Sequence, residues 1–159
     1  MVWKLKVRER SSCSWESGDK LAYANVIATD VVSICWYQNS EIHRTDGPAY
    51  ILAMPISANQ IARMEKMESP AQLDKWVRTS PARRMIWYIR NVCIKMKDDI
   101  RLTEQFPLID SRWIRNRIEE EIRRNGLEWR RWLNVAESLN LMDDGLLRLQ
   151  KQSELLFWL

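Results

Sequence analysis

The stretch "WYQNSEIHRTDGPAYI" (Trp36–Ile51) contains two turn signals set among runs of aromatic and β-branched residues. Asn39-Ser40 separates "CWYQ" from "EIHR", and asparagine tolerates the left-handed backbone that a two-residue hairpin turn requires. Asp46-Gly47-Pro48 makes a second reversal, and proline, which has no N–H, belongs at an edge or just outside a strand ladder. The stretch therefore predicts antiparallel strands and sets the fold of the first part of the chain.

The same stretch holds the single histidine of the chain, His43. Histidine is the side chain whose ordinary pKa suits acid–base catalysis, and Cys35 upstream could pair with it as a nucleophile in a hydrolase. The other interpretation is structural: His43, Asp46 and Gly47 shape the turn, with Asp46 hydrogen-bonded to the His43 ring or to nearby backbone N–H groups. We expect the structural role.

The stretch resembles one copy of the "WYxNGxxHRxDGPAxI" hairpin repeat, which is related to MORN-type repeats and is common in tailed-phage and giant-virus proteins. It covers about 16 of the 159 residues, and Ser40 stands where the repeat usually has glycine. The resemblance implies a β-hairpin module and a phage or viral origin, and it implies no enzymatic activity. The matching positions are Trp36, Tyr37, Asn39, His43, Arg44, Asp46, Gly47, Pro48 and Ala49.

On the N-terminal side, Trp3, Leu5 and Val7 alternate with basic residues, which is the period-two pattern of a half-buried strand. "LAYANVIATD" and "VVSICWYQ" are also rich in strand-forming residues. Because these segments follow one another too closely for helical crossovers, residues 1–56 are predicted to form a small antiparallel meander.

Beyond Ser57 the spacing becomes helical, and several segments open with a serine or aspartate cap. Two of them, beginning at Ser69 and Ser80, carry proline at the first helical position. Five or six helices are expected over residues 57–159. The predicted fold class is α+β, with the N-terminal meander packed on a larger C-terminal helical part as one compact unit.

Composition limits the class of protein. About 46% of the residues are hydrophobic, which is enough for a core, and no apolar run approaches the ~18 residues of a membrane span. No signal peptide is evident at the N-terminus, so a cytoplasmic location is expected, in a host cell if the protein is viral. Three scattered cysteines and one histidine predict no disulfide framework, no metal site and no cofactor. The excess of basic residues lies within residues 57–159, which hold 19 basic and 15 acidic side chains.

The segment 81–97 is predicted to be a basic helix with a broad apolar face. Trp87 and Ile94 fall on its polar side, framed by arginines, and such a patch suits a protein hot spot or a base-stacking platform. A helix buried on two sides is the third interpretation. The predicted partner-binding residues are Trp87, Arg83, Arg84, Arg90 and Ile94.

Farther on, Ile114, Ile118 and Ile122 recur four residues apart and predict the core stripe of a helix covered by arginine–glutamate pairs. The apolar end, Leu155–Leu159, must be buried in the core or in a contact with a partner, such as a homodimer. The predicted residues for nucleic-acid binding are Lys95, Lys97, Arg112, Arg130 and Arg131.

The sequence thus favours a small non-enzymatic protein of phage or viral type. Its expected partner is a host protein or nucleoprotein complex, for instance a defence or transcription assembly, bound through arginine- and tryptophan-rich helical surfaces. An RNA- or DNA-binding protein that uses the helix 81–97 is the main alternative, and a hydrolase built on Cys35 and His43 is a remote one.

Overall fold

The computed structural model describes residues 3–9, 12–28, 31–53, 58–64, 66–78, 81–101, 109–124, 126 and 128–158. The chain divides into two compact units, Met1–Pro107 and Leu108–Leu159. The first is an antiparallel sheet with two helices and the second is helical, so the predicted α+β class is confirmed. The units part between residues 107 and 108 and not at the predicted boundary of 56 and 57, because the sheet continues past the first two helices.

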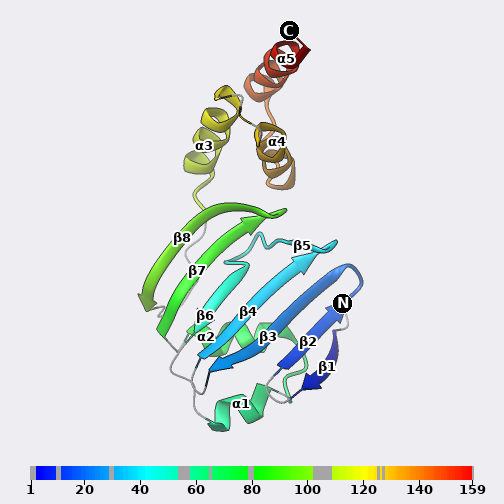
Figure 1. Cartoon of the computed structure of the whole chain (residues 1–159), viewed down its shortest axis with the longest axis vertical. Coiled ribbons are helices and arrows are strands. Elements are labelled where there is room, and N and C mark those ends of the chain that lie inside the picture. The colour runs from blue at the N-terminus through cyan, green and yellow to red at the C-terminus, as the bar shows by residue number, and fades with distance from the viewer. Residues whose placement is uncertain are drawn as a thin grey trace. The chain divides into compact units, whose positions relative to one another are not determined.

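Eight strands form one sheet in the order β1-β2-β3-β4-β6-β7-β8, with the short β5 paired to β4 (Figure 1). All of the pairings are antiparallel, as predicted for the N-terminal meander. The strands are β1 (Lys4–Glu9), β2 (Ser12–Ser17), β3 (Lys20–Ala28), β4 (Val31–Gln38), β5 (Glu41–Ile42), β6 (Tyr50–Ala53), β7 (Pro81–Ile89) and β8 (Val92–Arg101).

The prediction of a helix over residues 81–97 is wrong, because this segment is the β7–β8 hairpin. Arg90 and Asn91 both adopt positive φ, 47° and 67°, which is the backbone of a type I′ hairpin turn. The Asn39-Ser40 turn between β4 and β5 has the same geometry, with φ of 51° and 64°, and this turn was predicted. A hydrogen bond joins the two hairpins: the Asn91 side chain accepts it from the Ile42 N–H at 2.7 Å.

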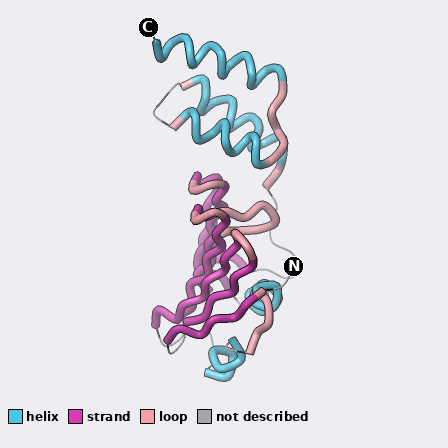
Figure 2. The backbone as a smooth tube through the Cα atoms, turned by 90° about the vertical axis from the view of Figure 1, so that its right-hand side faces the viewer, coloured by secondary structure: helices cyan, strands magenta, loops and turns pink. Residues whose placement is uncertain are grey.

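Helices α1 (Ala58–Met64) and α2 (Pro70–Arg78) connect β6 to β7 and lie on one face of the sheet (Figures 1 and 2). Trp15 of β2 points to that face, where its indole N–H donates to the Met67 carbonyl at 2.8 Å. We call this the covered face. The pleat and the strand register bring to it the buried side chains Cys13, Trp15, Ala22, Ala24, Val32, Ile34, Trp36, Ile51, Met85 and Trp87.

The second unit contains α3 (Ser111–Arg123), α4 (Trp129–Ser138) and α5 (Asp144–Trp158). The predicted start of α3 is confirmed, since the Asp110 side chain accepts a hydrogen bond from the Trp113 N–H at 2.8 Å. The predicted core stripe is confirmed too, because Ile114, Ile118 and Ile122 are buried.

Candidate functional site

The predicted partner-binding patch does not exist as a surface. Trp87 and Ile94 are only 1% exposed, because in the β7–β8 hairpin they pack into the core. Arg84 is exposed on the other face and pairs with Asp98 at 2.8 Å, while Arg90 lies in the turn, 3.4 Å from the Glu41 carboxylate. The side chain of Arg83 lies outside the described residues.

The residues predicted to bind nucleic acid belong to both units, and most are engaged locally. Lys95 lies over the Trp87 ring at 5.7 Å from its centroid, beside Lys97. Arg130 lies over the Trp129 ring at 5.2 Å, and Arg131 pairs with Glu128 at 3.2 Å. Arg130 and Arg131 thus each have a local partner, and Arg112 is an exposed residue near the start of α3. Nucleic-acid binding by these residues stays a prediction.

The predicted contact segment at the C-terminus is described only in part. Leu155 on α5 is 68% exposed, and the side chains of the four residues after it lie outside the described residues.

A different surface emerges on the other side of the sheet, which we call the open face. All four tyrosines of the chain lie on it. The register aligns Tyr23, Cys35, Tyr50, Ile86 and Met96 in one row across five strands.

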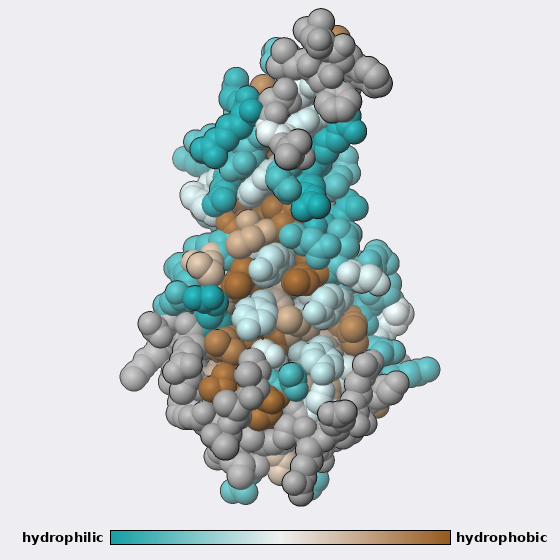
Figure 3. Space-filling view, in the orientation of Figure 1, coloured by the Kyte–Doolittle hydropathy of each residue, from teal (hydrophilic) through white to brown (hydrophobic). Residues whose placement is uncertain are grey.

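The remaining members of the open face extend this row on both sides. Tyr37 lies opposite Leu21, and Tyr88 lies opposite Cys93. The four tyrosines are each partly exposed, and Met96 is 53% exposed. Figure 3 shows this side of the sheet, where hydrophobic residues and residues of near-neutral hydropathy are gathered.

The open face is uncharged at its centre. Burial raises the pKa of Tyr50 and of Tyr88, and neighbouring Cys35 raises both further, so these phenols stay protonated. Burial also raises the pKa of the Cys35 thiol, which is the opposite of what a catalytic thiolate needs. The structure therefore lends no support to a hydrolase built on Cys35 and His43.

At two places on the margins of the open face, residues of opposite charge face each other. Arg84 and Asp98 form an ion pair, and the register sets Lys4 opposite Glu16. A surface of this kind presents aromatic rings and neutral hydroxyl groups, a combination that is enriched in protein interfaces. Its centre offers no basic side chain among the described residues to contact the phosphates that dominate affinity for nucleic acid.

The outer strands of the sheet, β1 and β8, are poorly suited to adding a strand from another chain. Lys4 on β1, and Lys95, Lys97 and Asp98 on β8, place charges along the two edges. Edge charges discourage strand addition, because pairing would bring another backbone against them. The face of the sheet is thus the more accessible surface.

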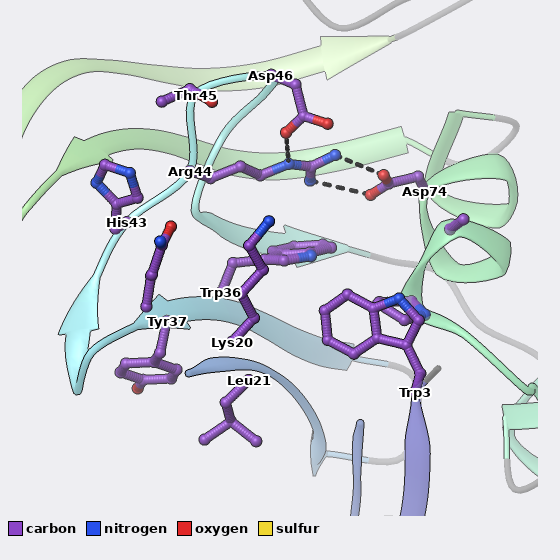
Figure 4. Close-up of a pocket in the computed structure, with 13 residues that line it drawn as sticks. Trp3, Lys20, Leu21, Trp36, Tyr37, His43, Arg44, Thr45, Asp46 and Asp74 are labelled. Carbon is purple, nitrogen blue, oxygen red and sulfur yellow. Dashed lines mark hydrogen bonds and ion pairs between the residues drawn. The ribbon is translucent and has the colours of Figure 1, made fainter. Parts of the chain in front are cut away.

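On the covered side, Arg44 fastens the segment between β5 and β6 to helix α2 (Figure 4). Its guanidinium is stacked 4.3 Å above the Trp36 ring and donates to both Asp74 oxygens, at 3.0 and 2.5 Å. Its Nε donates to Asp46 at 2.7 Å. Burial raises the pKa of the Asp46 carboxyl, but the hydrogen bond and charge of Arg44 lower it by more, so the net pKa lies below the ordinary value.

His43 is held by the other hairpin. Its Nδ1 accepts a hydrogen bond from the Arg90 backbone N–H at 3.1 Å. The predicted turn-shaping role therefore has a different geometry, since Asp46 bonds Arg44 and not the His43 ring. Burial, with the charges of Arg90 and Lys20, lowers the pKa of His43 despite the opposing effect of Glu41.

Acidification is therefore expected to destabilise the fold between pH 7 and pH 5.5. The folded-state pKa of His43 is depressed, so its stabilising contribution is complete above the unfolded value of ~6.5 and is lost as pH falls below it. This is the only histidine, and carboxyl groups titrate mainly below this window. Urea unfolding at the two pH values measures the loss. His43→Asn, which offers an acceptor to the same N–H, should flatten the dependence; a gain of stability on acidification would contradict it.

Clusters of metal ligands and membrane-spanning helices are both absent from the part of the chain that the structure describes. No group of three histidine, cysteine, aspartate or glutamate side chains among the described residues could hold a metal ion. Within the same part of the chain, no helix is long and apolar enough to cross a membrane.

Comparison with known proteins adds no relative: no family model, no curated protein and no solved structure matches the chain.

Proposed function

We propose that this protein is a non-enzymatic binding protein whose working surface is the open face of the sheet. The observation that carries the proposal is the gathering of all four tyrosines, each partly exposed, on the side of the sheet opposite α1 and α2. Tyrosine supplies large contact area with few rotatable bonds, and it is over-represented among residues that dominate binding energy.

The partner that best suits this surface is a protein with an apolar, weakly charged patch. The opposite charges of Arg84 and Asp98, and of Lys4 and Glu16, favour neither an acidic nor a basic partner at these two places. The resemblance of Trp36–Ile51 to a phage and giant-virus repeat supports a host protein or nucleoprotein complex as that partner. Nucleic acid remains the alternative, because tyrosines on a sheet can also stack on bases.

Met96→Glu is expected to abolish capture of a host protein without unfolding the chain. Met96 is 53% exposed at the end of the tyrosine row, so a carboxylate there would have to be buried against an apolar partner. Affinity capture from nuclease-treated host lysate, repeated with each variant, measures the effect. Leu147→Glu is the matched control, because Leu147 is 44% exposed but lies on α5 in the other unit.

The outcomes of this comparison separate the two partners. An open-face contact with protein would be contradicted if Met96→Glu and Leu147→Glu lost capture equally. It would also be contradicted if neither variant lost capture. Fluorescence anisotropy of a labelled single-stranded RNA is expected to stay flat up to about 100 μM protein at physiological salt. Tighter binding that collapses with added salt and is lost in Met96→Glu would favour the nucleic-acid alternative.

A further inference from the structure

A pocket of about 340 Å³ opens where the segment between β5 and β6 meets the start of α2. Its wall joins Trp3, the beginning of β3, the end of β4 and the first turn of α2 (Figure 4). In the same view Trp36 and Lys20 extend to the side of Arg44, whereas Tyr37 and Leu21 turn to the other side of their strands. Because Leu21 and Tyr37 still contribute to its lining, the pocket borders the open face at the ends of β3 and β4.

The guanidinium in the wall is already fully occupied. Arg44 donates to Asp46 and to both oxygens of Asp74, and its Nη1 also lies 3.4 Å from the Pro48 carbonyl. Three of the four carboxylate oxygens of these two aspartates are taken up in this way. The Asp46 side chain is 80% exposed, so water screens much of its charge, and the charge of nearby Lys20 is one of the causes that lower its pKa. This cluster holds the wall together and leaves little for a ligand.

Lys20 is different. Its side chain reaches past the Trp36 ring into the pocket (Figure 4), and among the described residues it has no carboxylate within ion-pair distance. A partly buried ammonium group with open hydrogen-bonding capacity favours an anionic oxygen. The indole of Trp3 stands beside this space and offers a flat apolar surface.

We propose that this pocket binds a small organic anion, namely a flat ring that carries one carboxylate or phosphate group. The anionic group contacts Lys20 and the ring lies against Trp3. The volume lies at the lower end of the ~300–1,000 Å³ range of small-molecule sites, which suits a ligand of one or two rings. Both the charge and the ring are needed, because each contributes one of the two contacts.

Four probes test the two contacts separately: benzoate, phenyl phosphate, the uncharged ring benzamide, and inorganic phosphate without a ring. The readout is the indole N–H resonance of Trp3, identified by its absence in Trp3→Phe. Saturable shifts are expected with benzoate or phenyl phosphate, and whichever binds more tightly identifies the head group. Benzamide and inorganic phosphate are expected to bind at least about tenfold more weakly, because each lacks one contact.

Substitutions at Lys20 test whether this residue supplies the positive charge that contacts the ligand. Lys20→Met keeps the aliphatic stem and is expected to weaken binding about tenfold, while Lys20→Arg retains it. Lys66→Met, a change at an exposed lysine after α1, is the matched control and leaves binding unchanged. An unchanged melting temperature shows that Lys20→Met is folded. The proposal is overturned if neither anion gives a saturable shift up to about 10 mM, or if Lys20→Met binds as tightly as the unmodified chain.

Discussion

Asp74→Ala is expected to lower the free energy of unfolding by about 3–5 kcal/mol, since it removes the less exposed of the two carboxylates that pair with the buried Arg44 guanidinium. The Arg44 side chain is only 6% exposed and is stacked on Trp36, so it cannot turn into water without exposing the ring. Both of its bonds to Asp74 would be lost together. Urea unfolding followed by tryptophan fluorescence measures the change.

Two variants show whether burial is the cause. Asp46→Ala removes the other carboxylate partner of Arg44, but that side chain is 80% exposed, so the expected cost is about 1 kcal/mol or less. The double change Arg44→Met with Asp74→Leu removes both charges and should recover much of the lost stability. Equal costs for Asp46→Ala and Asp74→Ala would show that burial does not determine how much each ion pair of Arg44 contributes to stability.

The N-terminal part of this fold could be predicted from the sequence because its signals are local and agree. Strict alternation marks the first strand, and the Asn39-Ser40 turn lies between two β-rich runs. The α3 start at Asp110 and its isoleucine stripe are equally plain, since cap and period coincide there. In these places propensity, turn chemistry and burial all point to the same structure.

The β7–β8 hairpin could not be predicted in the same way. "MIWYI" (Met85–Ile89) is a continuous apolar run, which fits both a helix and a buried strand. Its turn, Arg90-Asn91, contains no glycine, and Ser80-Pro81 mimics a helix start. Long-range pairing with β6 decides the matter, and pairing partners are invisible to a local pattern.

The same error hid the open face. If residues 81–97 form a helix, the sequence does not predict that Tyr88 and Ile86 lie on the same sheet face as Tyr23 and Tyr50. The available signal was the alternation of aromatic and apolar residues in each strand-like run, which puts Leu21 with Tyr23 and Cys35 with Tyr37 on one side. The pocket beside Lys20 could not be predicted from a local pattern either, because its wall combines Trp3, two strands and a helix.

Trp87→Ala is expected to cost about 3–5 kcal/mol of stability, the loss typical of a large aromatic side chain removed from a core. Trp87 lies on the covered face and is 1% exposed, whereas Trp113 on α3 is 42% exposed. Trp113→Ala is therefore the control, with an expected cost of about 1 kcal/mol or less. If Trp87→Ala folded normally but no longer bound the partner, Trp87 would belong to a binding surface, as the sequence alone predicted.

A second comparison separates the volume of the Trp87 ring from its polar atom. Among the described residues the buried indole N–H of Trp87 has no acceptor, whereas that of Trp15 donates to the Met67 carbonyl at 2.8 Å. Phenylalanine at either position removes similar ring volume, but only Trp15→Phe breaks a hydrogen bond and leaves a carbonyl unpaired. Trp15→Phe should thus cost about 1–3 kcal/mol more than Trp87→Phe in urea unfolding. Equal costs would mean that the Trp87 N–H has found a partner, such as a buried water molecule, that offsets its burial.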